Sequence, residues 1–514
     1  MTVSGEPGDS RLSRRRWSWA WVAFGLLLLV GMVLRLMDLR DEPLDFHPMP
    51  QLHRAMIARS MYQRSLHEGE AGGEPVPEAV QASVGAYEPP ILERLVATTY
   101  LLTGGENPWV ARIWNAGFWL IAAVLLFDLA RRSTSMEGGL VSLAYLLVLP
   151  FGVQVSRAFM PDSLMVLMIV VAGYALVRWK DRGTWAWALG AGLASGAAIL
   201  VKGRIAPMIL VTVVLVGLLD PNWKRVLRDL RWWTIGVLTL ALPAVYYGLL
   251  IPGSTSGWIQ EGTLNVLGMI LDPSFYTRWM SFLDQIVYLG MAVLAVVGTA
   301  LLPSTPRRLG LGWWLGFLAY GLLLPYNMVT HNYYSLPVVP AIALGLAPVG
   351  QLVLDRVRRL SFGWKAFAVA ASLLMVFYPA WRSRSVIVGQ DFHAEPLGWV
   401  KIGRELPTDG RIIAITQDYG YRLAYYGGRS VSLWPSVQDQ AYAELRGHNT
   451  SPNIAEVFAE RADGFRYFLV TNMGELEAQP DLKALLYAQY PVMAQDDSYI
   501  LFDLQLATEE SPAN

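Results

Sequence analysis

Long apolar runs constrain this chain more than any other feature of its sequence. About eleven of them recur along the chain, and the first, near residues 17–37, can cross about 30 Å of hydrocarbon as a helix. Only 16% of the residues are charged, against roughly 25% in soluble domains. We therefore predict a polytopic α-helical membrane protein.

The orientation of the chain is predicted from the basic residues around these runs. A basic segment, residues 1–16, precedes the first run and favours a cytoplasmic N-terminus. A signal peptide is the alternative, but no small-residue cleavage site follows the run. The predicted spans lie near residues 17–37, 109–130, 138–155, 163–179, 185–200, 205–219, 232–251, 286–302, 312–327, 335–354 and 364–381.

With this threading every basic cluster falls on the cytoplasmic side, as the positive-inside rule requires. A further span at 91–102 would invert every later loop, so we interpret 91–102 as an interfacial or partly embedded helix. The predicted localisation is the inner (plasma) membrane, with the C-terminus outside the cytoplasm. The clusters are at residues 131–132, 178–182, 224–231, 307–308 and 356–365.

Three segments then face outward: residues 38–108, residues 252–285 and residues 382–514. The transmembrane domain covers residues 17–381, and loop 38–108 carries amphipathic helices. In the tail, β-rich runs at 411–415, 467–470 and 499–502 alternate with helical stretches near 454–462 and 479–488, which predicts a soluble α/β domain. Residues 508–514 are predicted to be disordered. The chain has no cysteine, which excludes disulfides and thiolate metal sites.

The first outer loop carries carboxylates directly after the first span. Asp41 and Glu42 are typical of solvated anchors at a membrane boundary. Asp45 differs, because nearby prolines restrict its backbone and hold its side chain in one direction. His47 and His53 are conceivable metal ligands, but no compact cluster of further ligands surrounds them in the sequence, and we expect no metal and no cofactor.

The loop continues through an amphipathic helical stretch at residues 51–62 and ends at Glu88. Two prolines follow Glu88 and predict a stiff entry into the next helix. A structural turn and a binding role are both compatible with this segment.

Basic residues also occur on the outer side, where the positive-inside rule does not place them. Arg157 and Asp162 share one short turn, while Lys202 and Arg204 lie in another that has almost no loop. Charges at membrane depth are costly and usually functional. An anionic lipid substrate would compensate the cations; snorkelling or an Arg157 to Asp162 ion pair is the alternative.

A last outer turn, residues 325–334, is dense in hydrogen-bonding groups and aromatic faces. This mixture is typical of sugar or phosphate recognition, and aromatic belt residues resemble it in part. We favour a binding role for His331, Asn332 and Tyr333, and a belt role for Tyr326.

The order of these features resembles the GT-C class of membrane glycosyltransferases, specifically the protein-mannosyltransferase and aminoarabinose-transferase superfamily (glycosyltransferase family 39-like). The resemblance covers about residues 17–350. The segments that carry it are residues 44–48, 88–91, 109–113, 156–162, 202–203 and 332–340.

The resemblance implies inverting transfer of a sugar from a polyprenyl-phosphate carrier to an acceptor at the outer face of the membrane. It implies that Asp45 is the base that deprotonates the acceptor, with His47 and the Asp41-Glu42 pair as alternatives. It also implies that Lys202 and Arg204 hold the carrier phosphate. The mannosyltransferase-like branch is generally metal independent, and the chain fits that branch.

Two other functions stay open. A transporter or flippase would also need many spans, but it predicts inverted repeats and polar residues near the bilayer midplane, and the charges here gather at one boundary. A noncatalytic lipid-binding protein is the second alternative. The sequence does not tell which sugar is moved or whether the acceptor is a protein, a lipid or a glycan.

Overall fold

The computed structural model describes residues 8–67, 88–251, 264–446 and 453–506, with side chains from residue 19 onward. Residues 1–7 of the basic N-terminus and the side chains of residues 8–16 therefore lie outside the description, and the tail segment 508–514 lies wholly outside it. The chain forms two compact units. The first comprises Met1–Leu39, Tyr87–Leu92 and Trp109–Gln390, and the second Arg40–Ala86, Glu93–Pro108 and Asp391–Asn514.

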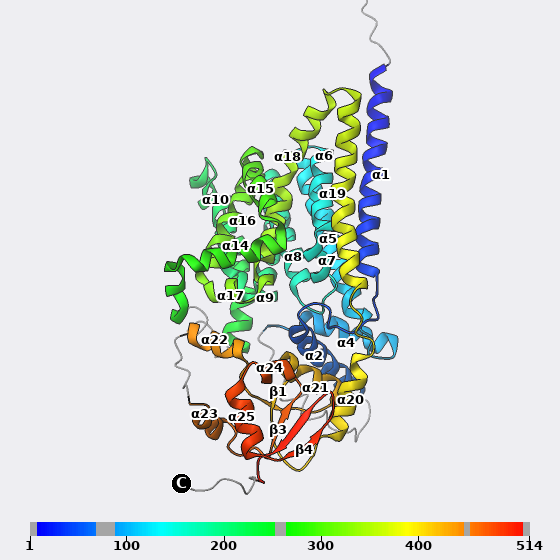
Figure 1. Ribbon diagram of the computed structural model, residues 1–514. Helices are drawn as coiled ribbons and strands as arrows, with labels where there is room; N and C mark the ends of the chain where they lie inside the picture. Colours follow the sequence, from blue (N-terminus) through cyan, green and yellow to red (C-terminus); the bar gives the residue numbers. More distant parts are fainter. Residues whose placement is uncertain (1–7, 68–87, 252–263, 447–452, 507–514) are drawn as a thin grey trace, which may run out of the picture. The chain divides into compact units, whose positions relative to one another are not determined.

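The first unit is helical (Figure 1). Each range predicted as a span falls on one or two of its helices. The elements are α1 (Gly8–Leu36), α5 (Trp109–Ser133), α6 (Met136–Val148), α7 (Pro150–Val155), α8 (Asp162–Arg182), α9 (Trp185–Val201), η1 (Gly203–Ile205), α10 (Ala206–Leu218), α11 (Trp223–Leu227), α12 (Leu230–Pro243), η2 (Ala244–Leu250), η3 (Leu264–Leu271), α14 (Pro273–Val287), α15 (Leu289–Leu301), α16 (Ser304–Leu323), α17 (Pro325–Thr330), η4 (Asn332–Val338), α18 (Val339–Arg358) and α19 (Phe362–Val388).

The helices of this unit are those of a multi-pass membrane protein. In the described part of the chain six helices are long and apolar enough to cross a membrane, or seven if the bent pair α14 and α15 is one span. This pair turns by 87° at its break. Shorter apolar helices occupy other predicted positions, among them α6 and α9. The number of eleven crossings stays a prediction.

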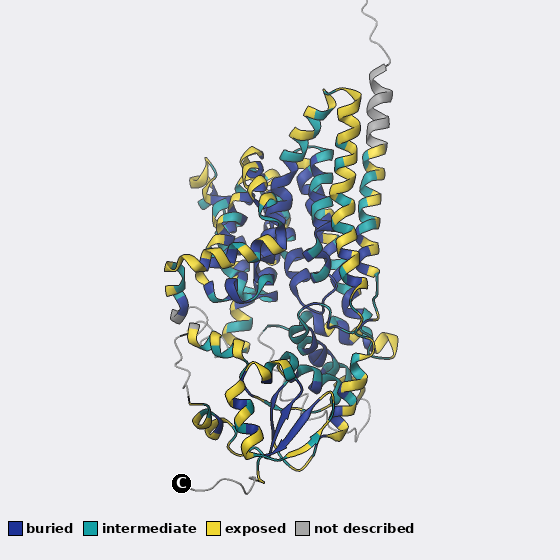
Figure 2. Ribbon diagram, viewed as in Figure 1, coloured by how far each residue is buried: buried dark blue, intermediate teal, exposed yellow. Residues whose placement is uncertain are grey.

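Helix α19 illustrates why these surfaces require lipid. Its most apolar window has no buried residue, and large side chains such as Phe367, Leu374 and Phe377 are exposed. Figure 2 shows this helix exposed along most of its length, while α8 has a largely buried window. A long helix that is apolar and uncovered would be unstable in water, and it is the expected surface of a membrane span.

Small residues allow close helix packing in this unit. A Cβ atom at Gly298 of α15 would clash with the carbonyl oxygen of Gly345 on α18. A Cβ atom at Gly345 would in turn clash with the carbonyl oxygen of Ala295. Small residues at such contacts let two backbones approach, which is how membrane helices gain packing energy without a hydrophobic driving force.

The second unit is a three-layer α/β fold preceded by segments of the predicted outer loop 38–108. The predicted helix at 91–102 is present as α4; its position at a membrane interface stays a prediction. The elements are α2 (Pro48–His67), α4 (Ile91–Thr103), α20 (Glu395–Glu405), β1 (Ile412–Ile415), η5 (Gln417–Gly420), α21 (Tyr421–Gly427), β2 (Ser432–Leu433), α22 (Val437–Leu445), α23 (Ile454–Arg461), β3 (Tyr467–Val470), α24 (Met473–Glu477), α25 (Pro480–Gln489), β4 (Val492–Gln495) and β5 (Ile500–Asp503).

The sheet has the strand order β2-β1-β3-β5-β4. Strand β1 pairs in parallel with β2 and β3, and β5 pairs antiparallel with both β3 and β4. Both faces of the sheet are covered, since Phe468 and Phe502 pack with α23, α24 and α25 on one face, whereas Leu469 and Leu501 pack with α20 and α21 on the other. Strands buried on both faces read as continuous apolar runs, which is why β1, β3 and β5 lie where the sequence predicts strands.

The sequence did not predict β2 and β4. Strand β2 has only two residues, and β4 is mostly exposed at the edge of the sheet. Neither has the buried, continuous apolar pattern that identifies the central strands.

We expect Gly298→Ala to lower the stability of the protein, because the added methyl group must push α15 away from α18. Overpacking of this kind typically costs about 1–3 kcal/mol. Gly290→Ala in the same helix is the control, since no heavy atom lies within 4 Å of a Cβ atom there. Thermal unfolding in detergent measures both, and equal melting temperatures would contradict the packing argument.

Candidate active site

A buried ion pair joins two helix ends of the first unit. Asp162 is the first residue of α8, and Lys202 follows the last residue of α9. Lys202 Nζ donates to Asp162 Oδ1 at 2.6 Å, with 8% and 0% of the two side chains exposed. Partial positive charge at the N-terminus of α8 further favours the carboxylate.

The turn after Lys202 is short and tightly packed. Gly203 opens η1, and a Cβ atom at this position would lie 3.2 Å from the ring of Tyr247. The Tyr247 hydroxyl donates to the carbonyl of Leu200 at 3.0 Å, which fixes the ring against the end of α9. Glycine thus lets Tyr247 cover the turn, and Arg204 is the next residue of η1, before α10 begins at Ala206.

Two adjacent tyrosines of η4 surround the cations. Lys202 Nζ lies 5.2 Å from the ring centre of Tyr333 and 5.4 Å from that of Tyr334. The Arg204 guanidinium lies 5.0 Å from the ring centre of Tyr334 and donates to its hydroxyl. Cations over aromatic faces are stabilised by the ring quadrupole, more strongly where water is excluded.

Further predicted residues adjoin this cluster. Glu88 interacts electrostatically with Arg204. The His331 ring lies 5.5 Å from the ring of Tyr333 and 5.8 Å from that of Tyr334. Asn332 begins η4 directly after His331. We call Glu88, Asp162, Lys202, Arg204, Tyr333 and Tyr334 the cation cluster.

The second carboxylate oxygen of Asp162 gives the cluster a polar group for a ligand. This atom, Oδ2, is buried and has no hydrogen-bond partner among the described residues. A buried carboxylate oxygen is costly without a donor. The cluster therefore offers cations to an anion and an acceptor to a hydroxyl group.

Arg157 has a different environment from the one that the sequence suggested. It donates to the carbonyls of Arg35, Met37 and Asp38, the last at 3.2 Å, where α1 ends. The alternative of an Arg157 to Asp162 pair is therefore wrong, since Asp162 pairs with Lys202. A guanidinium with five donors suits a helix end that leaves several carbonyls without helical partners.

Asp45 and His47 lie in the second unit. Both are half-buried, and His47 has a positive φ of 46°. The Gln51 side chain donates to the carbonyl of Phe46 at 2.5 Å and ties this bend to α2. The cation cluster belongs to the first unit, and a site shared with Asp45 and His47 stays a prediction.

The neighbouring carboxylates of this loop hold other parts of the second unit. Asp41 accepts hydrogen bonds from the backbone amides of Glu42 at 2.9 Å and Phe392 at 2.8 Å. Glu42 accepts one from the Tyr426 hydroxyl at 2.9 Å. Both carboxylates thus connect the loop to the C-terminal segment of the same unit.

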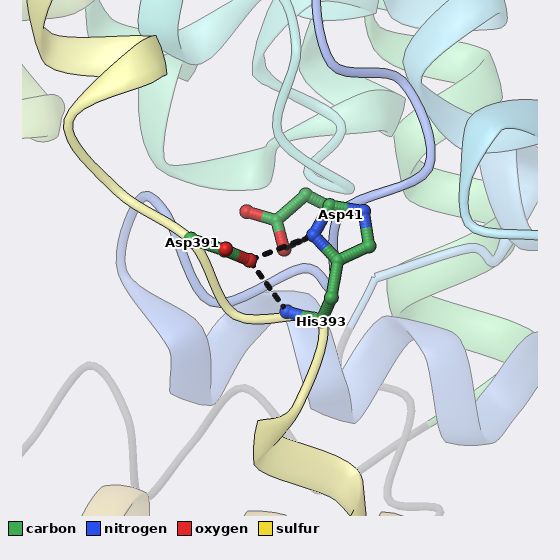
Figure 3. A group of neighbouring side chains, drawn as sticks. All are labelled: Asp41, Asp391 and His393. Atoms are coloured by element: carbon green, nitrogen blue, oxygen red, sulfur yellow. Dashed lines mark hydrogen bonds and ion pairs between the residues drawn. The ribbon is translucent and has the colours of Figure 1, made fainter.

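One group of the described residues has the composition of a metal site. Figure 3 shows Asp41, Asp391 and His393, whose ligand atoms lie within 4.8 Å of one another. His393 Nδ1 lies 2.8 Å from Asp391 and 3.4 Å from Asp41, so a protonated imidazole would bridge the two carboxylates by itself. Asp391 and His393 are exposed. The expectation that the protein uses no metal stays a prediction.

The sequence did not single out Tyr334 and Tyr320. Tyr320 of α16 is fully buried and interacts electrostatically with Arg204 and Asp162. Tyr334 stands next to Tyr333 in a segment rich in aromatic residues. The sequence therefore shows that it lies in this aromatic turn, but it does not show its contact with Arg204. Only the approach of η4 to the end of α9 distinguishes it from belt residues.

We expect Lys202→Met to destabilise the protein by about 3–5 kcal/mol, because removal of one partner leaves a buried, uncompensated carboxylate. Lys202→Met combined with Asp162→Asn should recover part of this loss, since it removes both charges. Thermal unfolding in detergent compares the single and double variants. A single variant as stable as the wild type would mean that the pair is not buried as described.

Comparison with known proteins identifies the fold. The model of the dolichyl-phosphate-mannose-protein mannosyltransferase family matches residues 87–247. No curated protein matches the sequence significantly. The structure is similar to ArnT from Cupriavidus metallidurans bound to undecaprenyl phosphate, with 15% identity, a TM-score of 0.54, and 94% of this chain and 98% of that chain covered. It is also similar to the oligosaccharyltransferase AglB from Archaeoglobus fulgidus in complex with an inhibitory peptide and a dolichol-phosphate, with 11% identity, a TM-score of 0.58, and 97% and 75% covered. The chain thus has the GT-C fold of membrane glycosyltransferases and is mannosyltransferase-like over residues 87–247.

Proposed function

We propose that the protein transfers a sugar from a polyprenyl-phosphate carrier to an acceptor at the extracytoplasmic face of the membrane, with inversion at the sugar carbon. The observation that carries this proposal is the cation cluster, in which Lys202 is buried and Arg204 half-buried at the turn between α9 and α10. A transferase of this kind needs cations where the carrier phosphate lies.

The cluster suits a lipid phosphate on physical grounds. An ammonium group has three donors, and the hydrogen bond to Asp162 uses one of them. Charges at this depth are rare unless they serve a ligand, an ion or a proton. Lys202 and Arg204 would stabilise the negative charge that grows on the phosphate as the sugar leaves, which is how fixed cations lower such barriers.

Asp162 and Glu88 have roles that follow from their position in the cluster. Asp162 orients Lys202, and its buried Oδ2 would accept a hydrogen bond from a sugar hydroxyl. Glu88 neighbours Arg204 and would limit the excess positive charge before the donor binds. Tyr333 and His331 would offer faces and hydrogen-bonding edges to the sugar.

Asp45 is the proposed general base. His47 and the Asp41-Glu42 pair are the alternatives. Asp41 accepts a hydrogen bond from the Phe392 amide and Glu42 one from the Tyr426 hydroxyl, which suits these two carboxylates to anchoring the loop. Asp45 would take the proton of the acceptor hydroxyl as its oxygen attacks the sugar carbon from the face opposite the phosphate. The carbon–phosphate oxygen bond breaks on the other side, and the polyprenyl phosphate leaves as an anion.

The proposal distinguishes this enzyme from a flippase. A flippase would move the carrier without breaking the bond between sugar and phosphate. The family match over residues 87–247 and the GT-C fold support a transferase. A noncatalytic lipid-binding protein would bind the carrier and release no sugar.

Sugar release from a polyprenyl-phosphate mannose donor by the purified protein in lipid vesicles tests the function. We expect Asp45→Asn to lower turnover by about 10²–10⁴-fold, because a general base contributes that much. Binding of the donor should be unchanged. Lys202→Ala should instead weaken donor binding and turnover together.

Asp497→Asn is the matched control, since this exposed carboxylate lies in the loop between β4 and β5. Activity that is lost in Asp45→Asn, kept in Asp497→Asn and indifferent to a chelator supports a metal-independent transferase. A fully active Asp45→Asn variant would rule out this base. No turnover of the wild type with any common sugar donor would move the flippase or lipid-binding alternatives ahead.

A further inference from the structure

The C-terminal α/β domain reaches the first outer loop through two adjacent tyrosines. Tyr425 and Tyr426 lie on α21, which packs against α2 within the second unit. Their rings are nearly perpendicular, at 81°, so the two side chains point to different segments of the loop. Each meets a charged residue there.

Tyr426 holds the part of the loop just before Asp45. Its hydroxyl donates to Glu42 Oε2 at 2.9 Å, three residues before the proposed base. Burial, together with the neighbouring Glu42 carboxylate, raises the pKa of Tyr426 far above its usual value, so the group stays a neutral donor. The Phe392 amide holds Asp41 in the same way. The two residues before Pro43 are therefore both fixed from the C-terminal segment.

Tyr425 holds α2, the helix that follows the proposed base. Arg59 of α2 lies 3.8 Å from the ring centre of Tyr425 and donates to the carbonyl of Tyr425 at 2.7 Å. Glu106 pairs with the same guanidinium at 2.7 Å. Met56 packs on Ala424 beside these contacts. The loop with Asp45 is thus held by α21 both before and after the base.

A strained turn sets the direction of α21. After β1, Asp418, Tyr419 and Gly420 have φ values of 48°, 56° and 76°, all in the left-handed region. Glycine adopts this region freely, whereas the other two residues do so at a cost. Arg422 fixes the turn through ion pairs with Asp418 at 2.5 Å and Glu395 at 2.6 Å. Strain of this kind is retained mainly where a functional group must be aimed.

We propose that Tyr426 is a positioning residue for the catalytic loop, and that the C-terminal α/β domain serves to hold Asp45 in its reactive place through α21. This inference rests on the proposed function, because it assigns Asp45 as the base. It gives the C-terminal domain a role in turnover without contact between Tyr426 and the substrate. Glu42 is then an anchor and not the base.

The test measures transfer from a polyprenyl-phosphate mannose donor by full-length Tyr426→Phe. The substitution removes one hydroxyl and keeps the ring, so folding should survive. We expect kcat to fall by about 10- to 100-fold, because a displacement of about 1 Å of a reacting group has that effect. KM for the donor should stay unchanged, since the cation cluster belongs to the first unit.

Two further variants show whether Tyr426 acts through Glu42. Glu42→Ala should lower kcat as much as Tyr426→Phe does, and the double variant should be no worse than either, since contacts in one network are not additive. Glu42→Gln keeps an oxygen that accepts the tyrosine hydroxyl and should retain most activity. Tyr487→Phe, an exposed tyrosine of α25, is the control and should match the wild type.

The outcomes separate this inference from the proposed function. A wild-type kcat in Tyr426→Phe, with Asp45→Asn inactive, overturns the positioning role alone. Multiplicative losses in the double variant also overturn it, as does a Glu42→Gln variant as inactive as Asp45→Asn, which would make Glu42 the base. A wild type that releases no sugar from any common polyprenyl-phosphate donor contradicts the transferase itself.

Discussion

The ion pair between Lys202 and Asp162 is the interaction on which the membrane unit depends most directly. A lone ammonium or carboxylate at this depth would be too costly to keep ionised, so the two helix ends that carry them must meet. Their meeting brings the end of α9 to the start of α8, and η4 then covers both with Tyr333 and Tyr334. The same residues therefore pair the buried charges at the two helix ends and form a site that could bind an anion.

The fold divides the proposed chemistry between two units. The membrane helices satisfy their own backbone groups, as lipid demands, and the first unit holds the cation cluster. The loop with Asp45 instead clusters with the C-terminal domain. Binding of a lipid phosphate and activation of an acceptor hydroxyl make different demands, since the first needs fixed cations and the second a base that meets varied acceptors. A transferase whose donor and acceptor arrive by different routes can hold the phosphate-binding cations and the base on different parts of the fold.

Much of the fold was predictable because its signals are local. Hydropathy over a window of about 20 residues located the helices that are long and apolar enough to cross a membrane, and continuous apolar runs located β1, β3 and β5. The partners of the site residues could not be predicted from the sequence. Arg157 and Lys202 looked alike as outward-facing cations, yet one serves the carbonyls at the end of α1 and the other a carboxylate. Their sequence neighbours give no sign of this difference.

The sequence by itself determined the membrane class, the places of the long apolar helices and central strands, and the small set of charged residues from which a site can be built. These follow from hydrophobicity and its period, which each segment carries alone. Only the tertiary structure decided that Lys202 pairs with Asp162, that Tyr334 meets Arg204, and that residues 40–86 and 93–108 group with the C-terminal domain. Such choices depend on which distant segments approach within a few ångströms, and no local pattern encodes that distance.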